Sequence, residues 1–205
     1  MPSLDSIQDT LDTLYSGVNG YGLSQADRVG ERREQKSLTY GEMLLEPFSR
    51  VLAAVKPAPG EVFYDLGSGT GKVVLMANML APFAKTVGIE FLPKLHDQAS
   101  AIVDRYAQEI KPSLPDATAE IAVRQGDMLT EDLTDADVIF VHSTCMGEEL
   151  IAGLAERVRA CKPTTRFALI SRGFFGMPWL ANTERFDYTN AWNTQSTCFV
   201  YKLAA

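Results

Sequence analysis

Short apolar runs and longer stretches of helical periodicity alternate along most of this chain. The short runs have the length and bounds of buried strands and lie near residues 62–66, 85–89, 119–124, 137–141 and 166–170. Between them, apolar side chains recur every three or four residues, which predicts helices over 42–55, 72–80, 93–110 and 147–160. This alternation of strands and helices is typical of a parallel sheet with helices on both faces.

Both ends of the chain depart from this alternation. Residues 3–20 have the pattern of a short helix, and the polar residues 24–37 are expected to be helical in part, with Ser24 as a candidate N-cap. Near the C-terminus, residues 185–188 and 197–201 have strand patterns with no helical stretch between them. The expected α/β fold is therefore a mostly parallel seven-stranded sheet with an antiparallel C-terminal hairpin and helices on both faces.

Composition and charge narrow the class of protein. The 205 residues fit one domain, at 39–205, preceded by a helical segment at 1–38. The chain lacks a long apolar run and a secretory signal, so we expect an intracellular protein, most simply cytoplasmic, without membrane attachment. The net charge of −7 disfavours direct binding to nucleic acid. Three scattered cysteines and two histidines form no cluster typical of a metal site, and the oligomeric state stays open.

A glycine-rich turn carries the strongest chemical signal in the sequence. Asp65 lies near the end of the first strand, three glycines follow at alternate positions, and a helical pattern begins at once. The residues of this turn are Gly67, Ser68, Gly69 and Gly71. Glycine lets the backbone turn sharply and approach a ligand closely, as at the start of many nucleotide-binding α/β domains. The spacing differs from that of a dinucleotide site, because Lys72 stands where the last glycine is needed.

Acidic residues follow three successive strands: Asp65, Glu90 and Asp127. The carboxyl ends of parallel strands share one edge of the sheet, which is where ligands of such folds bind. Asp65 suits the cationic ammonium and sulfonium of S-adenosyl-L-methionine, and Glu90 can accept hydrogen bonds from both ribose hydroxyls. Asp127 can accept one from the adenine amino group. The pattern predicts an S-adenosyl-L-methionine site and a methyltransferase, with a nicotinamide oxidoreductase as a distant alternative.

Several segments together resemble one family, the non-SET histone-lysine methyltransferases named for disruption of telomeric silencing. The similar segments are Thr-Tyr-Gly-Glu at 39–42, Val-Val-Leu at 73–75, Gly-Asp-Met-Leu at 126–129, the strand at 138–141 with Gly-Glu-Glu at 147–149, and Trp192 before Phe199. The resemblance runs from about residue 39 to 202. It implies a Rossmann-like seven-stranded methyltransferase sheet, S-adenosyl-L-methionine as cofactor with S-adenosyl-L-homocysteine as product, and a protein substrate that carries the acceptor lysine.

The resemblance also implies roles for individual positions. The cofactor residues would be Tyr40, Glu42, Asp65, Gly67, Ser68, Gly69, Gly71, Glu90, Asp127, Met128 and Ser143. The residues at the methyl acceptor would be Tyr40, Ser143, Trp192 and Phe199, of which the last two would line a narrow aromatic passage for the substrate amine. No metal takes part.

The chain departs from the family pattern at two places. His142-Ser143-Thr144 stands after the fourth strand where the family has Asn-Asn-Phe, and Phe199 stands where the family has a tyrosine. We expect His142 to cap or pack rather than to act as a base. A histone substrate would move the expected location to the nucleus. The alternatives are a small-molecule N- or O-methyltransferase, with a closed pocket capped by residues 1–37, and a catalytically silent cofactor-binding module.

Overall fold

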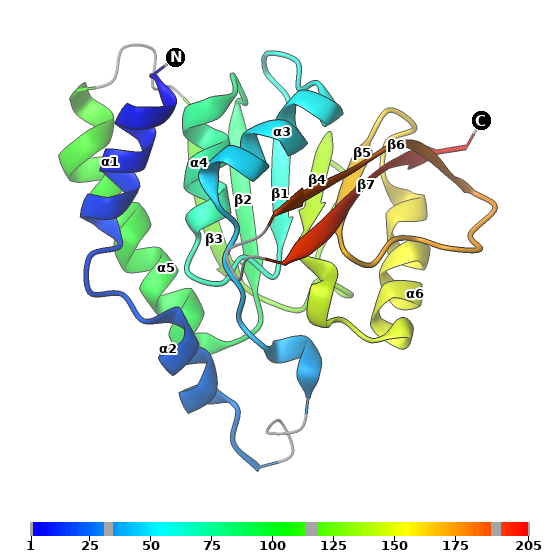
Figure 1. Cartoon of the computed structure of the whole chain (residues 1–205), viewed down its shortest axis with the longest axis horizontal. Helices are drawn as coiled ribbons and strands as arrows, with labels where there is room; N and C mark the ends of the chain where they lie inside the picture. The colour runs from blue at the N-terminus through cyan, green and yellow to red at the C-terminus, as the bar shows by residue number, and fades with distance from the viewer. Residues whose placement is uncertain (1, 31–34, 114–118, 190–193, 205) are drawn as a thin grey trace.

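A seven-stranded sheet forms the centre of the molecule (Figure 1). The computed structural model describes residues 2–30, 35–113, 119–189 and 194–204. The strands are β1 (Val62–Leu66), β2 (Lys85–Glu90), β3 (Glu120–Gln125), β4 (Val138–Val141), β5 (Arg166–Ile170), β6 (Leu180–Thr189) and β7 (Gln195–Leu203). They lie in the order β3-β2-β1-β4-β5-β7-β6. The first five are parallel, and β7 runs antiparallel to β5 and β6. The predicted fold class is confirmed.

Helices pack on both faces of the sheet. They are α1 (Leu4–Leu14), α2 (Gly20–Asp27), α3 (Leu45–Val55), α4 (Lys72–Leu80), α5 (Pro93–Arg105) and α6 (Glu148–Arg157). Adjacent side chains of a strand point to opposite faces, so Phe63 joins the core under α1, α3 and α4, and Tyr64 joins the core under α6. Phe48 of α3 meets Phe63 and Phe140 edge to face. No helix in the described ranges is long and apolar enough to cross a membrane.

The face of the sheet that α6 covers carries fewer helices than the opposite face. The connections at 126–137 and 171–179 run from one strand to the next without an α-helix. Leu133 and Ala136 from the first connection and Phe174 from the second are buried against this face instead. Irregular loops therefore complete this half of the core and leave the carboxyl edge of the sheet accessible beside them.

The N-terminal segment packs onto the sheet domain. The apolar side of α1, formed by Ile7, Leu11 and Leu14, belongs to the same core as α3 and α4. The helix predicted over residues 3–20 is shorter than expected, since α1 ends at Leu14. The boundary between residues 38 and 39 stays a prediction.

Helix α2 and the short 3₁₀ turn η2 (Lys36–Leu38) lie along the carboxyl edge of the parallel strands (Figure 1). Asn19 caps α2 by accepting a hydrogen bond from the backbone N–H of Gly22, so the prediction that Ser24 is the cap is wrong. Ser24 lies inside the helix and donates to the carbonyl of Leu38 at 2.9 Å. The hydroxyl therefore joins α2 to the turn that follows.

Asp27 anchors the end of α2 to α5. Its two carboxylate oxygens accept hydrogen bonds from the backbone N–H and the Nζ of Lys94, at 2.6 and 2.7 Å. Asp27 is only 6% exposed, so this ion pair is shielded from solvent on one side. The N-terminal segment is thereby fixed over the sheet edge that the sequence marks as the ligand site.

Candidate functional site

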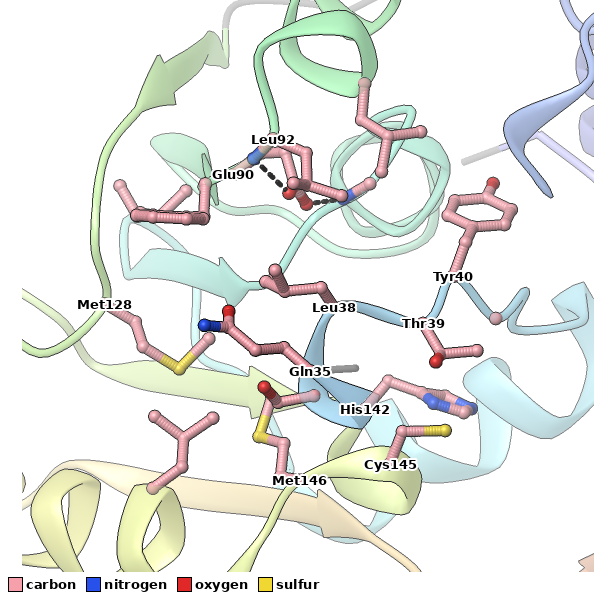
Figure 2. Close-up of a pocket in the computed structure, with 18 of the residues that line it drawn as sticks. Gln35, Leu38, Thr39, Tyr40, Glu90, Leu92, Met128, His142, Cys145 and Met146 are labelled. Carbon is pink, nitrogen blue, oxygen red and sulfur yellow. Dashed lines mark hydrogen bonds between the residues drawn. The ribbon is translucent and has the colours of Figure 1, made fainter. Parts of the chain in front are cut away.

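A pocket of about 530 Å³ lies at the carboxyl edge of the sheet. Its volume falls in the range of small-molecule sites. Residues that line it come from the N-terminal segment, the glycine turn and the ends of three strands, and include Tyr21, Gln35, Leu38, Thr39, Tyr40, Gly67, Gly69, Glu90, Phe91, Asp127, Met128, His142, Thr144, Cys145 and Met146. Figure 2 shows Met128 at one end of the pocket and Tyr40, His142 and Cys145 toward the other.

The glycine turn reaches the pocket with its backbone. Gly67 and Gly69 have φ angles of +84° and +56°, which side-chain-bearing residues rarely adopt. The backbone N–H groups of Gly67 and Ser68 donate to the carbonyl of Ile89, so the turn is fixed to β2. A Cβ atom at Gly69 would lie 2.6 Å from the Cε2 atom of Tyr40, so the ring of Tyr40 closes directly over this glycine.

Two members of the turn face away from the pocket. Ser68 packs against β2, where a Cβ atom at Gly88 would lie 2.7 Å from its hydroxyl oxygen. Gly71 precedes α4, and a Cβ atom there would lie 3.3 Å from that of Ala99. Neither residue contributes to the pocket wall. The structure therefore packs Ser68 and Gly71 away from this wall and places Gly67 and Gly69 on it, and the cofactor contacts of all four stay predictions.

Glu90 is held in one orientation at the end of β2. Its Oε2 accepts from the backbone N–H of Gly69 at 2.7 Å, and its Oε1 accepts from that of Leu92 at 2.8 Å (Figure 2). Burial raises the pKa of Glu90, and these backbone N–H groups partly oppose the rise. A carboxylate has about four acceptor positions, so further hydrogen bonds to a ligand hydroxyl are available on the pocket side.

Asp65 is a buried carboxyl group directly behind the glycine turn. It is 2% exposed, and burial raises its pKa well above the ordinary value, with a further contribution from the charge of Glu90. Asp65 does not form part of the pocket wall. The neighbouring carboxyl groups of Asp65 and Glu90 disfavour an anionic ligand and favour a cationic one, because a positive charge would stabilise the ionised forms of both.

A network of hydrogen bonds closes the Tyr40 loop over the turn. The Tyr40 hydroxyl donates to Oε1 of Glu42 at 3.0 Å and lies 2.9 Å from the hydroxyl of Thr70. Glu42 in turn pairs with Lys72 at 3.4 Å and does not reach the pocket wall. Lys72, which interrupts the expected dinucleotide spacing, therefore ties the loop to the start of α4. Burial raises the pKa of Tyr40, so its hydroxyl stays protonated near neutral pH.

The opposite end of the pocket follows β3. Oδ1 of Asp127 accepts from the backbone N–H of Leu129 at 2.9 Å, and Met128 lines the wall beside it. Phe91 also lines this wall and is 39% exposed, although it directly follows the buried Glu90. Phe91 is not among the residues predicted from the sequence, although a large apolar side chain just beyond a strand end, where the sheet no longer buries it, was an available signal.

The segment after β4 differs from its expected arrangement. Ser143 is fully buried, and its hydroxyl lies 2.6 Å from the carbonyl oxygen of Ile170 and 2.7 Å from that of Arg172, to which it donates. It therefore ties β4 to β5 and does not form part of the pocket wall. His142, Thr144 and Cys145 line the pocket in its place. Burial lowers the pKa of His142, which favours the neutral imidazole.

The structure does not bring Phe199 to this pocket. Phe199 packs edge to face on Phe175, at 5.2 Å between ring centres, in a separate hollow formed by β6, β7 and the 174–178 loop. Arg185 lies over the same ring at 5.4 Å. Trp192, the other predicted wall of the aromatic passage, lies outside the described residues. Among the described residues, no group of three or more His, Cys, Asp or Glu side chains could hold a metal ion.

Comparison with known proteins shows the family of this chain. The family model for the histone methylation protein DOT1 matches residues 24–191. The chain belongs to this family. Its relatives include the "Histone-lysine N-methyltransferase, H3 lysine-79 specific" of Dictyostelium discoideum, 28% identical over 56% of this chain and 6% of the relative. The protein of the same name from Eremothecium gossypii is 25% identical over 77% of this chain and 28% of the relative. The chain thus spans less than a third of the length of these DOT1-family relatives.

Solved structures agree on the fold. An RNA methyltransferase from Salinibacter ruber, solved with S-adenosyl-L-homocysteine, matches with a TM-score of 0.62 over 80% of this chain and 94% of that chain. The two sequences are 21% identical, so the likeness concerns the fold alone. The DOT1-family match begins at residue 24, inside α2, and ends at residue 191, so it includes strands β1 to β6 and leaves out β7.

Proposed function

We propose that this DOT1-family chain is an S-adenosyl-L-methionine-dependent methyltransferase that methylates the side-chain nitrogen of a protein lysine. One observation carries the proposal: a single pocket, in a chain of this family, brings together the glycine turn, the fixed carboxylate of Glu90 and the turn at Asp127. In this proposal the protein works where its substrate is, which is the nucleus for a histone.

The charge around the glycine turn supports a cationic adenosyl ligand. Asp65 and Glu90 lie behind and beside Gly69, and burial raises the pKa of both carboxyl groups. A dinucleotide pyrophosphate would meet two acids here, whereas an ammonium and a sulfonium would neutralise them. Gly67 and Gly69 would receive the amino-acid part, Glu90 the ribose, and Phe91, Asp127 and Met128 the adenine. When bound, this cofactor supplies an electrophilic methyl group on a good leaving group.

The other end of the pocket suits a desolvated amine. A lysine in water has a pKa of about 10.4, so roughly one in 10³ is neutral near pH 7. Apolar groups from Leu38, Tyr40 and Met146 line this part of the pocket and would lower the pKa of an amine that enters it. The chain's own contribution is therefore to orient the amine, to exclude water and to favour its neutral form.

Calorimetry with matched variants tests the cofactor part of the proposal. Micromolar binding of S-adenosyl-L-methionine and S-adenosyl-L-homocysteine is expected for the wild type. Glu90→Gln should weaken both by about 100-fold, because one acceptor of the ribose hydroxyls is replaced by an amide donor. Glu120→Gln is the matched control, since Glu120 lies on β3, pairs with Lys85 at the surface and is remote from the pocket wall. Equal affinities in the two variants would contradict the assignment.

Transfer of a labelled methyl group tests the acceptor. Histone octamers, a lysine-rich peptide and cell-lysate protein are incubated with the protein and S-adenosyl-L-methionine labelled in the methyl group. Incorporation into lysine, located by mass spectrometry and lost in Glu90→Gln, is the expected result. Label that appears only in the fraction soluble in acid would overturn the lysine assignment.

A small-molecule N- or O-methyltransferase is the second candidate, and one observation favours it. Tyr21, Gln35 and Ser37 line the pocket, and all three belong to the residues 1–37 that were expected to cap such a site. Phe199, expected in an open passage for a protein lysine, lies elsewhere. The partition of label between protein and small molecules in one lysate experiment decides between the two candidates.

A further inference from the structure

His142 occupies a fixed place beside the glycine turn. β4 pairs with β1 so that Val141 lies opposite Leu66, and the two residues that leave the sheet next are His142 and Gly67. The 3₁₀ turn η5 (Ser143–Cys145) begins immediately after His142. The buried hydroxyl of Ser143 bonds to the end of β5 and so holds this turn in place.

The side chain of His142 lies on the pocket wall at the end away from the adenine residues. His142 and Cys145 lie together on the Tyr40 side of the pocket, and Met128 lies on the other side (Figure 2). In the proposed binding mode, Asp127 and Met128 take the adenine, Glu90 takes the ribose, and the glycine turn takes the amino-acid part. The methyl-bearing centre joins the ribose to the amino-acid part, so in this binding mode it lies over the glycine turn, on the side that His142 borders.

We propose that His142 accepts a hydrogen bond from the amine of the methyl acceptor and so aims the nitrogen lone pair at the transferred methyl group. This inference rests on the proposed function and adds a positioning residue to it. It replaces Ser143, which the sequence placed at the methyl group.

A neutral imidazole suits this task. Burial lowers the pKa of His142, so near neutral pH the ring carries one N–H donor and one acceptor nitrogen. The acceptor amine then donates one N–H to the ring and keeps its lone pair free. The lone pair forms the new N–C bond, the C–S bond electrons remain on sulfur, and the positive charge passes to the methylated nitrogen. That nitrogen, now an ammonium, donates a stronger, charge-assisted bond to His142 until it releases a proton to solvent.

A pair of cofactor analogues tests the position of His142 without any acceptor substrate. S-adenosyl-L-homocysteine lacks the methyl group, whereas sinefungin carries an amine in its place. We expect His142→Leu to lower the affinity for sinefungin by about 10-fold, which is about 1.4 kcal/mol, and to change the affinity for S-adenosyl-L-homocysteine by less than 2-fold. His142→Asn retains an acceptor oxygen and should keep most of the sinefungin affinity. His96→Gln, on α5 and outside the pocket wall, is the matched control.

A spectroscopic readout separates contact from a structural role. The chain has two histidines, so the imidazole signals are assigned by comparing the wild type with His142→Leu. In NMR spectra, sinefungin should shift the resonances of the His142 ring nitrogens more than S-adenosyl-L-homocysteine does. The resonances of the His96 ring nitrogens should stay unchanged.

Each outcome of this experiment decides something. If both analogues bind, the His142 signals respond equally to them and His142→Leu keeps the affinity ratio, the inference is overturned and the proposed function stands. If neither analogue binds to the wild-type protein, the proposed function falls and the inference falls with it.

Discussion

The two ends of the pocket are built differently. At the end that we propose for the cofactor, Gly67, Glu90 and Asp127 lie at the ends of three neighbouring strands, and hydrogen bonds with the backbone hold them there. At the end that we propose for the methyl acceptor, the wall comes from connections, the segment 35–41 and the residues after β4. The sheet determines where the first group lies, whereas side-chain packing of irregular segments determines the second. The two ends should therefore respond differently to substitution.

The largest expected effect is at Gly69, on the cofactor end. Gly69→Ala forces a side-chain-bearing residue to φ +56° and places its Cβ against the ring of Tyr40. Backbone strain of this kind costs about 1–2 kcal/mol, and the displaced Tyr40 loop should reduce the affinity for S-adenosyl-L-homocysteine more than 100-fold. Thermal unfolding and calorimetry measure the two quantities.

Gly60→Ala is the matched control, because it introduces the same kind of backbone strain away from the pocket. Gly60 has a φ angle of +86°, and a Cβ atom there meets nothing within 4 Å. Its variant should lose similar stability and keep full affinity for S-adenosyl-L-homocysteine. If both glycine variants bind this ligand equally well, Tyr40 does not close over a ligand site at Gly69.

At the end of the pocket that we propose for the cofactor, the sequence predicted the strands and the acids at their ends because these signals are local. Apolar runs located β1, β2 and β3, and the acids at or near their ends had to share one edge of a parallel sheet. Even there, the sequence could not tell that Ser68 and Gly71 turn away, because this depends on the packing of Gly88 and Ala99 against them.

The acceptor end could be predicted only in part. Ser143 and His142 are neighbours, and which of them faces the pocket is decided by the bonds of Ser143 to the carbonyls of Ile170 and Arg172, 27 and 29 residues away in the chain. Phe199 was expected at the passage, but the register of β7 with β5 sets it opposite Leu169, one pair inside the strand end. Both outcomes depend on long-range contacts that a local pattern does not contain.

Asp65→Asn should separate stability from binding at the cofactor end. Replacing a buried acid whose pKa is raised should stabilise the free protein at pH 7. The same change removes the negative charge that would attract the ammonium and sulfonium, so the affinity for S-adenosyl-L-methionine should fall by roughly 30-fold. Chemical denaturation and calorimetry on the same preparations measure both. A variant that loses stability would show that the Asp65 charge already has a compensating partner.

The pH dependence of the free energy of unfolding tests the sign of the effect of Asp65 on stability. Because the folded-state pKa of Asp65 is raised, its favourable contribution is fully present below the unfolded-state value near pH 4 and is lost as the pH rises through the folded-state value. The free energy of unfolding of the wild type should therefore decline over this window more steeply than that of Asp65→Asn. Affinity for S-adenosyl-L-methionine should rise over the same window in the wild type only, because ionised Asp65 attracts the cation.

Tyr40→Phe has a moderate expected effect, since it lies where the two ends meet. It keeps the ring over Gly69 and removes the hydroxyl that contacts Glu42 and Thr70. We expect a loss of about 1 kcal/mol of stability and roughly 5-fold weaker S-adenosyl-L-homocysteine binding. Tyr64→Phe is the matched control, because the Tyr64 hydroxyl donates to Asp135, outside the pocket wall. Tyr64→Phe should lose similar stability and keep its affinity for S-adenosyl-L-homocysteine. If Tyr64→Phe weakened this affinity as much as Tyr40→Phe does, the effect of Tyr40→Phe would not be specific to the pocket.

The smallest expected effect on the site is that of Phe199→Leu. Phe199 packs on Phe175 in the hollow under the terminal hairpin, so the change should cost about 1 kcal/mol of stability through lost packing. Affinity for S-adenosyl-L-homocysteine and the rate of methyl transfer to protein should both stay within about 2-fold of the wild type, because this hollow and the pocket share no lining residue. A 10-fold slower transfer with intact cofactor binding would instead show that the acceptor chain crosses the hollow on its way to the pocket. The acceptor end would then extend to β7, as the sequence predicted, and a protein rather than a small molecule would be the substrate.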